Sequence, residues 1–187
     1  MKTAILIHGY NDESEYRDET RPSPSNDHWI PWLQRQLQLT GILAQAPDMP
    51  GFFEPNYEGW KDMLERFDLN EDTILVGHSC GGGFLLRYLS ENDVKVGKVV
   101  LVAPWIDPNK IIDKNFFDFD IEENIADKTS KLIVMYSKDD FPEIIETIET
   151  IKSKTEGVNF QEFEDKGHFV FSSLKTDKFQ ELLDNLV

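Results

Sequence analysis

The sequence contains one cysteine, Cys80, and no long apolar run. A lone cysteine forms no internal disulfide, so the fold must be stabilised by its core, and a reducing cytoplasm is the expected location. No stretch approaches the roughly 20 apolar residues that a membrane-spanning helix needs. Residues 1–9 are too short and too polar at their end for a signal peptide, and they predict instead a strand that runs into a turn.

Basic residues are scarce as well. The chain has 19 Lys and Arg against 35 Asp and Glu, which gives a net charge of −16. Such a surface repels the phosphates of nucleic acids and of anionic membranes, so neither is expected as a partner. Solubility is the simplest role of this charge, and salt adaptation and a preference for cationic substrates are the alternatives.

Signatures of metal and cofactor binding are also missing. The four histidines lack the spacing of metal ligands. The sequence has no phosphate-binding P-loop and no dinucleotide-binding fingerprint. We therefore expect neither a metal nor a cofactor.

What the sequence does contain is a regular alternation of β-rich runs and helical patterns. Its 187 residues, 40% of them apolar, suffice for one domain, residues 1–187, with its own core. Strands are predicted at residues 3–7, 42–44, 73–76, 99–103, 132–136 and 158–163, and helices at 29–39, 57–67, 81–89, 143–151 and 179–187. This alternation predicts an α/β fold in which helices cover both faces of a mostly parallel sheet of about six strands.

Two polar segments interrupt the alternation. Residues 11–27 are rich in acidic residues and contain two prolines, and loops of this length are usually functional or disordered. Residues 107–127 combine acidic residues with the aromatic stretch 116–119. The second segment is either a small lid or a crossover with exposed aromatic side chains.

One motif points to chemistry. Gly77-His78-Ser79-Cys80-Gly81 matches the G-x-S-x-G pattern of a nucleophile elbow, and it directly follows a predicted strand and precedes a predicted helix. The serine of an elbow has a strained backbone, so the residues two positions away must be small. The helix that begins here directs its N–H groups at the reacting centre. Ser79 is therefore the candidate nucleophile.

A serine hydroxyl needs a base, and the base needs a carboxylate that orients it. His168 follows the last predicted strand, which is where α/β-hydrolases carry the base. The acid should follow the preceding strand, where Asp139 and Asp140 are adjacent. Spacing alone does not separate these two, although either gives the chain order of an α/β-hydrolase triad.

An oxyanion hole requires two N–H donors. We expect the backbone amides of Cys80, directly after the nucleophile, and of Tyr10, in the loop after the first strand. The elbow should turn the Cys80 side chain away from the site. Four aromatic residues near the motifs are candidates for the substrate pocket: Trp29, Phe52, Trp105 and Phe169.

Several motifs together carry a family resemblance. Residues 7–10 read Ile-His-Gly-Tyr and residues 27–33 read Asp-His-Trp-Ile-Pro-Trp-Leu. With the elbow at 76–81, Ser-Lys-Asp-Asp at 137–140 and Gly-His-Phe at 167–169, they resemble the small single-domain serine hydrolases that include retinoblastoma-binding protein 9 and the YdeN-like bacterial proteins. The resemblance covers nearly the whole chain and implies a three-layer α/β-hydrolase sandwich with a minimal cap or none.

The resemblance also bears on the acid. The family's S-x-x-D motif places the triad acid at its last position, which favours Asp140. The sequence departs from the family where Phe141-Pro142-Glu143 replaces a short run ending in Val-Pro, so Asp139 stays the alternative. Residues 11–27 are also longer than the family's corresponding loop.

The predicted function is that of a carboxylesterase-like serine hydrolase. Ser79, His168 and Asp140 would cleave a small acyl ester, thioester or activated amide. One alternative is a protein-binding module that retains a hydrolase fold, although the intact set of three residues argues against lost catalysis. Another is a peptidase on short peptides, which ranks below the esterase because the sequence shows no recognisable pocket for a free amine. The expected partner is a small acyl substrate.

Overall fold

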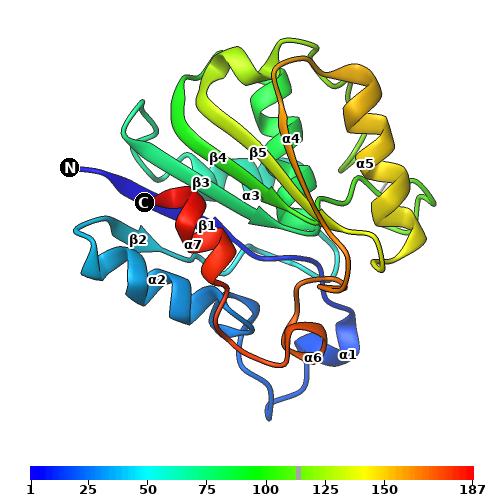
Figure 1. The fold of residues 1–187 in the computed structure, drawn as a ribbon. Helices are drawn as coiled ribbons and strands as arrows, with labels where there is room; N and C mark the ends of the chain where they lie inside the picture. Colours follow the sequence, from blue (N-terminus) through cyan, green and yellow to red (C-terminus); the bar gives the residue numbers. More distant parts are fainter. Residues whose placement is uncertain (113–114) are drawn as a thin grey trace.

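A six-stranded β-sheet forms the centre of the computed structural model, which describes residues 1–112 and 115–187 (Figure 1). Its strands are β1 (Thr3–Ile7), β2 (Leu43–Gln45), β3 (Thr73–His78), β4 (Val96–Val102), β5 (Thr129–Ser137) and β6 (Asn159–Phe163). Their order is β2-β1-β3-β4-β5-β6, and every neighbouring pair is parallel. The predicted α/β fold is confirmed, with a sheet that is parallel throughout.

Helices cover the sheet on both sides. Helices α2 (Ile30–Leu39) and α7 (Gln180–Leu186) lie together on one face, and α3 (Tyr57–Leu64) and α4 (Cys80–Glu91) lie on the other (Figure 1). Helix α5 (Pro142–Lys154) connects β5 to β6. The short elements are α1 (Glu13–Tyr16), η1 (Pro24–Asn26), η2 (Ile125–Lys128) and α6 (Phe171–Leu174).

The burial of the strands explains why their sequences predicted them. All six residues of β3 are buried, because helices cover this central strand on both faces. Strand β6 pairs only with β5, and its residues are exposed or half-buried. The alternating sequence of 158–163 therefore correctly predicted an edge strand.

Helix ends differ from the predicted ranges by one to three residues, and two differences have a structural explanation. The helix predicted at 57–67 ends at Leu64. The prediction extended to Phe67 because this residue packs half-buried against the core from the following turn, and so continues the apolar stripe beyond the helix. Helix α1 lies within the segment predicted as a loop, where the Asp12 carboxylate accepts a hydrogen bond from the Glu15 amide at 2.8 Å. A helix of four residues is too short to show a periodic pattern.

The connection from β4 to β5 packs against helices. Phe116 is 1% exposed, and its ring centroid lies 5.1 Å from that of Trp60. Arg87 of α4 donates a hydrogen bond to the Phe116 carbonyl at 2.8 Å. Exposure of this aromatic side chain was therefore a wrong prediction. Residues 113–114 lie outside the described residues, so the lid prediction for 107–127 stays a prediction.

The candidate site residues all follow strands of this sheet. The loops after β1, β3, β5 and β6 carry residues 8–10, Ser79, residues 138–140 and His168, respectively. Parallel strands bring their carboxyl ends to one edge, where open α/β sheets bind ligands. Among the described residues, no helix is long and apolar enough to span a membrane.

Candidate active site

Ser79 lies in a tight turn between β3 and α4. Its backbone has φ 54° and ψ −120°, a conformation that is strained for a residue with a side chain. The Ser79 amide donates to the Val102 carbonyl at 2.9 Å, and the Ser79 carbonyl accepts from the amides of Gly83 and Trp105, both at 3.0 Å. These bonds to the helix and to the end of β4 hold the strained turn in place.

The glycines on either side of Ser79 permit close backbone approach. A Cβ atom on Gly81 would lie 2.4 Å from the His8 carbonyl oxygen, and one on Gly77 would lie 2.5 Å from the Gly81 carbonyl oxygen. Real Cβ contacts are not this short, so larger residues would displace the elbow. The predicted need for small residues two positions from the serine is confirmed.

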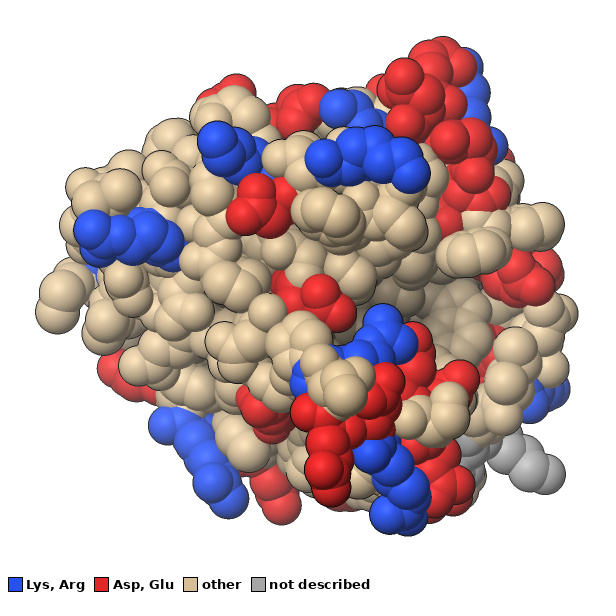
Figure 2. Space-filling model, turned by 90° about the horizontal axis from the view of Figure 1, so that it is seen from below, with Lys and Arg blue, Asp and Glu red and all other residues tan. Residues whose placement is uncertain are grey.

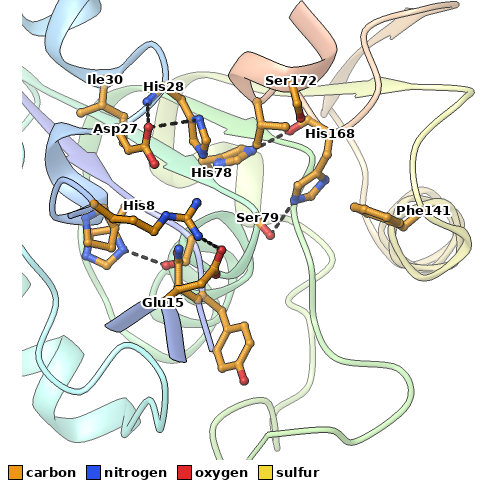
Figure 3. A pocket seen from close by; sticks show the side chains of 16 residues that line it. His8, Glu15, Asp27, His28, Ile30, His78, Ser79, Phe141, His168 and Ser172 are labelled. Carbon is orange, nitrogen blue, oxygen red and sulfur yellow. Dashed lines mark hydrogen bonds and ion pairs between the residues drawn. The ribbon is translucent and has the colours of Figure 1, made fainter. Parts of the chain in front are cut away.

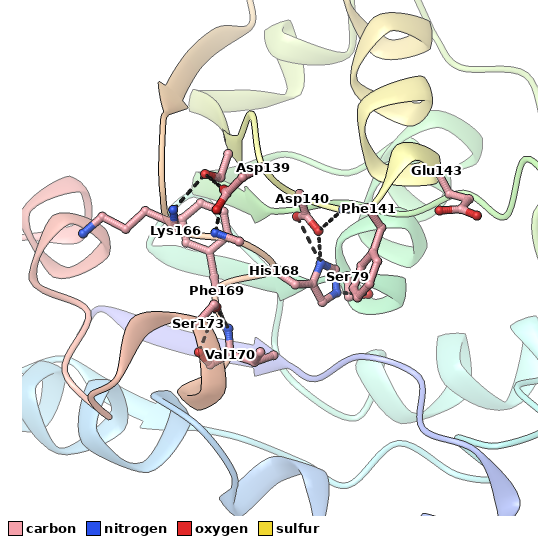
Figure 4. A network of polar contacts seen from close by, with 12 residues as sticks. Ser79, Asp139, Asp140, Phe141, Glu143, Lys166, His168, Phe169, Val170 and Ser173 are labelled. Atoms are coloured by element: carbon pink, nitrogen blue, oxygen red, sulfur yellow. Dashed lines mark hydrogen bonds and ion pairs between the residues drawn. The ribbon is translucent and has the colours of Figure 1, made fainter.

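A chain of hydrogen bonds joins three side chains at this edge (Figure 4). His168 Nε2 lies 3.0 Å from Ser79 Oγ, and His168 Nδ1 lies 2.9 Å and 3.1 Å from the two carboxylate oxygens of Asp140. The Asp140 side chain is 0% exposed, and the His168 side chain is 17% exposed. The Phe141 amide also donates to Asp140 Oδ1, at 2.7 Å. The structure thus brings Ser79, His168 and Asp140 together.

Asp139 has a different set of partners. Its Oδ1 accepts hydrogen bonds from the Ser137 hydroxyl at 2.6 Å and from the Gly167 amide at 2.9 Å. The Ser137 bond, followed by that of Gly167, lowers the pKa of the Asp139 carboxyl. Asp139 therefore ties the loop after β5 to the loop that carries His168, while Asp140 contacts the imidazole itself (Figure 4).

The two expected oxyanion donors lie next to Ser79. A Cβ atom on Gly9 would lie 3.1 Å from Ser79 Cβ, so the backbone that continues into Tyr10 passes beside the serine. Cys80 is the first residue of α4, and the first amides of a helix have no acceptor within it. The Cys80 thiol is 0% exposed, and burial raises its pKa well above the ordinary value. This thiol is therefore protonated and unsuited to act as a nucleophile.

A cavity of about 380 Å³ opens at Ser79 (Figure 3). All four histidines of the chain, His8, His28, His78 and His168, line it. Residues 11–27 supply much of the remaining polar wall, including an ion pair between Arg21 and Glu15. Within the described part of the chain, no group of three His, Cys, Asp or Glu side chains is placed to hold a metal ion.

His78 is a site residue that sequence reasoning did not identify. Its Nε2 donates a hydrogen bond to the His168 carbonyl at 2.9 Å, because a carbonyl oxygen can only accept. Burial lowers the pKa of His78 well below the ordinary value, so its ring is neutral at pH 7. His78 therefore supports the backbone of His168, and nothing in the elbow pattern signals this contact.

The four aromatic candidates for the pocket lie elsewhere. Trp29 and Phe169 are 1% and 0% exposed, and the Trp29 indole donates to the Phe169 carbonyl at 2.9 Å. Phe52 packs against the His8 ring, and Trp105 packs against the Tyr10 ring. None of the four lines the cavity at Ser79, whereas Phe141 does. Proximity in the sequence thus did not identify the side chains that line this cavity, and a role of these four in binding substrate stays a prediction.

Comparison with known proteins places the chain in a family. A profile of the family described as serine hydrolase matches residues 4–178. This chain belongs to that family. It is also 33% identical over 106 residues to YdeN of Bacillus subtilis (strain 168), an alignment that covers 54% of this chain and 50% of YdeN. The matched part thus spans about half the length of this curated relative.

Solved structures of other proteins have the same fold. The ydeN gene product of B. subtilis superposes with a TM-score of 0.76 at 26% identity, over 100% of this chain and 97% of the other. An esterase from Exiguobacterium antarcticum superposes with a TM-score of 0.61 at 14% identity, over 100% and 90% of the two chains. The resemblance to the YdeN-like serine hydrolases is confirmed.

Proposed function

We propose that this serine hydrolase family member is a carboxylesterase-like enzyme that cleaves a small acyl ester, thioester or activated amide. The observation that carries the proposal is the continuous path from Ser79 Oγ through the His168 ring to the buried carboxylate of Asp140. Such a path supplies a nucleophile, its base and the group that orients the base.

The geometry supports a two-step reaction. Ser79 Oγ attacks the acyl carbon while its proton passes to His168 Nε2, and the bond to the leaving group breaks as that group takes the proton from His168. The backbone amides of Cys80 and Tyr10 are the proposed donors to the oxyanion. Water then gives a proton to His168 and attacks the acyl carbon, which releases the acid and returns the proton to Ser79.

The buried Asp140 carboxylate has a defined part in this scheme. Bonded to Nδ1–H, it holds the His168 tautomer whose Nε2 accepts the serine proton, and it stabilises the charged imidazolium. Asp139 makes no such contact, since its partners are Ser137 and Gly167. The two adjacent aspartates therefore form a matched pair of variants.

The test combines a fluorophosphonate label with hydrolysis of chromogenic acyl esters. The wild type should be labelled and active, and Ser79→Ala should lose both. Asp140→Asn should lower kcat on the order of 10³–10⁴-fold because the imidazole loses its orienting carboxylate. Asp139→Asn should lower kcat less than tenfold, although it should lower the thermal midpoint.

Two results would contradict the proposal. Equal labelling and hydrolysis by Ser79→Ala would remove the serine as nucleophile. Loss of kcat in Asp139→Asn but not in Asp140→Asn, with both variants folded by circular dichroism, would reassign the acid to the neighbouring residue.

A further inference from the structure

Phe141 is an exposed aromatic side chain at the mouth of the Ser79 cavity. It is 61% exposed and is one of eight exposed large hydrophobic side chains among the described residues, whose exposures range from 44% to 88%. Phe141 alone among these eight lines the cavity that contains Ser79 and His168. An exposed phenyl ring in this place offers apolar surface that a ligand can cover.

The backbone around Phe141 is held firmly. Its amide donates to the Asp140 carboxylate at 2.7 Å, and its carbonyl accepts from the Ile144 amide at 3.0 Å. Pro142 follows and restricts Phe141 to an extended conformation, observed at φ −58° and ψ 144°. The carboxylate that holds His168 therefore also fixes the residue that carries the ring.

The ring lies beside the proposed base. The ring centroids of Phe141 and His168 are 5.3 Å apart, with an angle of 62° between the planes. In Figure 3 Phe141 and His78 lie on opposite sides of His168. The His78 ring thus contacts one side of the His168 imidazole, and the Phe141 ring contacts the other side.

The chemistry of ester cleavage decides which part of a substrate meets this ring. His168 must return its proton to the leaving oxygen, so the leaving group has to lie next to His168 Nε2. The carbonyl oxygen of the substrate should point instead toward the proposed oxyanion donors, the amides of Tyr10 and Cys80. A leaving group held at His168 therefore comes within reach of Phe141.

We propose that Phe141 determines specificity by binding the leaving group, and that the enzyme prefers esters of aromatic alcohols to esters of small alkyl alcohols. The inference rests on the proposed function, since it assigns the substrate class of the same site. An aromatic group gains both burial of apolar surface and a ring–ring contact at this wall. A small alkyl group leaves most of the Phe141 ring in water.

The test compares phenyl acetate with ethyl acetate, which share an acyl group, in the wild type and in Phe141→Ala. The variant should raise KM for phenyl acetate about tenfold, the effect of removing one apolar pocket wall, and leave kcat within about twofold. KM for ethyl acetate should stay within about twofold. The KM of Phe141→Leu for phenyl acetate should lie between those of the wild type and Phe141→Ala. Phe171→Ala removes an exposed ring that does not line the cavity, so its KM values should match those of the wild type.

Each other outcome overturns the inference in a recognisable way. Equal losses of kcat on both esters in Phe141→Ala would mean that the ring acts only through His168. Unchanged KM on both esters would mean that no leaving group contacts it, while the proposed function survives. If the wild type hydrolyses neither ester and Ser79→Ala is labelled like the wild type, the proposed function fails and the inference fails with it.

Discussion

His8 uses both of its ring nitrogens in a buried site. Its Nδ1 donates to the Gly9 carbonyl at 2.8 Å, and its Nε2 accepts from the Met49 amide, also at 2.8 Å. His8 is 1% exposed, and burial lowers its pKa despite the opposing effects of the Gly9 hydrogen bond and the Asp48 charge. A proton on Nε2 would face the Met49 N–H, so the charged form costs a hydrogen bond as well as desolvation.

This arrangement predicts that stability falls as the solution becomes acidic. The unfolded chain binds protons on histidine below about pH 6.5, whereas folded His8 and His78 resist them because their pKa values are lowered. The unfolded state then binds more protons, so the free energy of unfolding decreases as pH falls from about 6.5 toward 5.5, above the range where carboxylates titrate. Thermal unfolding at pH 7.5 and at pH 5.5 measures the effect.

The matched variant is His8→Gln, whose side-chain carbonyl can still accept from the Met49 amide. It should be less stable at pH 7.5 and lose less stability on acidification. A wild type whose midpoint is the same at both pH values would show that the buried histidines take up protons without unfolding.

Single residues differ in how far the sequence alone predicts them. The pairing of Ser79 with His168 could be predicted because an elbow is a local pattern and the candidate base has an expected place in the chain order. Spacing could not separate Asp139 from Asp140, because the side chains of adjacent loop residues are directed by contacts to distant segments. The support of His168 by His78 joins positions 90 apart in the sequence, and no local pattern encodes it.

At the scale of elements, α4 packs closely against the loop after β4. A Cβ atom on Gly83 would lie 1.9 Å from the Trp105 carbonyl oxygen and 2.8 Å from the Phe117 ring. Gly59 in α3 is also helical, but its nearest neighbours would be 3.7 Å away, an ordinary contact. The same substitution should therefore have opposite effects in the two helices.

Gly83→Ala should lower the free energy of unfolding by about 1–3 kcal/mol, because the added methyl group has no room and the backbone must shift. Gly59→Ala should raise it by up to about 1 kcal/mol, because alanine has the higher helix propensity. Urea unfolding of both variants measures the two changes. A Gly83→Ala protein as stable as the wild type would mean that the loop after β4 moves away from α4 at little cost.

The elements themselves were largely predictable, and the exceptions have two causes. Central strands such as β3 are apolar on both faces, and helices such as α5 carry an apolar stripe that the periodicity reveals. Helices α1 and α6, of four residues each, are too short for periodicity and depend on local caps. The end of α3 was misplaced because Phe67 contacts the core from outside the helix.

At the scale of the whole molecule, charge of one sign dominates. Acidic groups exceed basic groups by 16, and Figure 2 shows clusters of acidic side chains on one face with basic groups beside them. Lys138 pairs with two acids, Glu162 at 3.0 Å and Glu164 at 2.7 Å. Pairs as exposed as these contribute only about 0–1 kcal/mol each, so the uncompensated negative charge should govern the effect of salt.

This balance predicts that NaCl stabilises the protein. Screening shortens the Debye length from about 30 Å at 0.01 M to about 10 Å at 0.1 M, which weakens repulsion between acidic groups more than it weakens the few close pairs. The thermal midpoint at pH 7.5 should rise by a few degrees over this range and level off above it, since little repulsion remains to be screened. KCl should give the same curve, because screening depends on ionic strength rather than on the cation. A midpoint that falls as salt is added would show instead that the close pairs stabilise the fold more than the excess charge destabilises it.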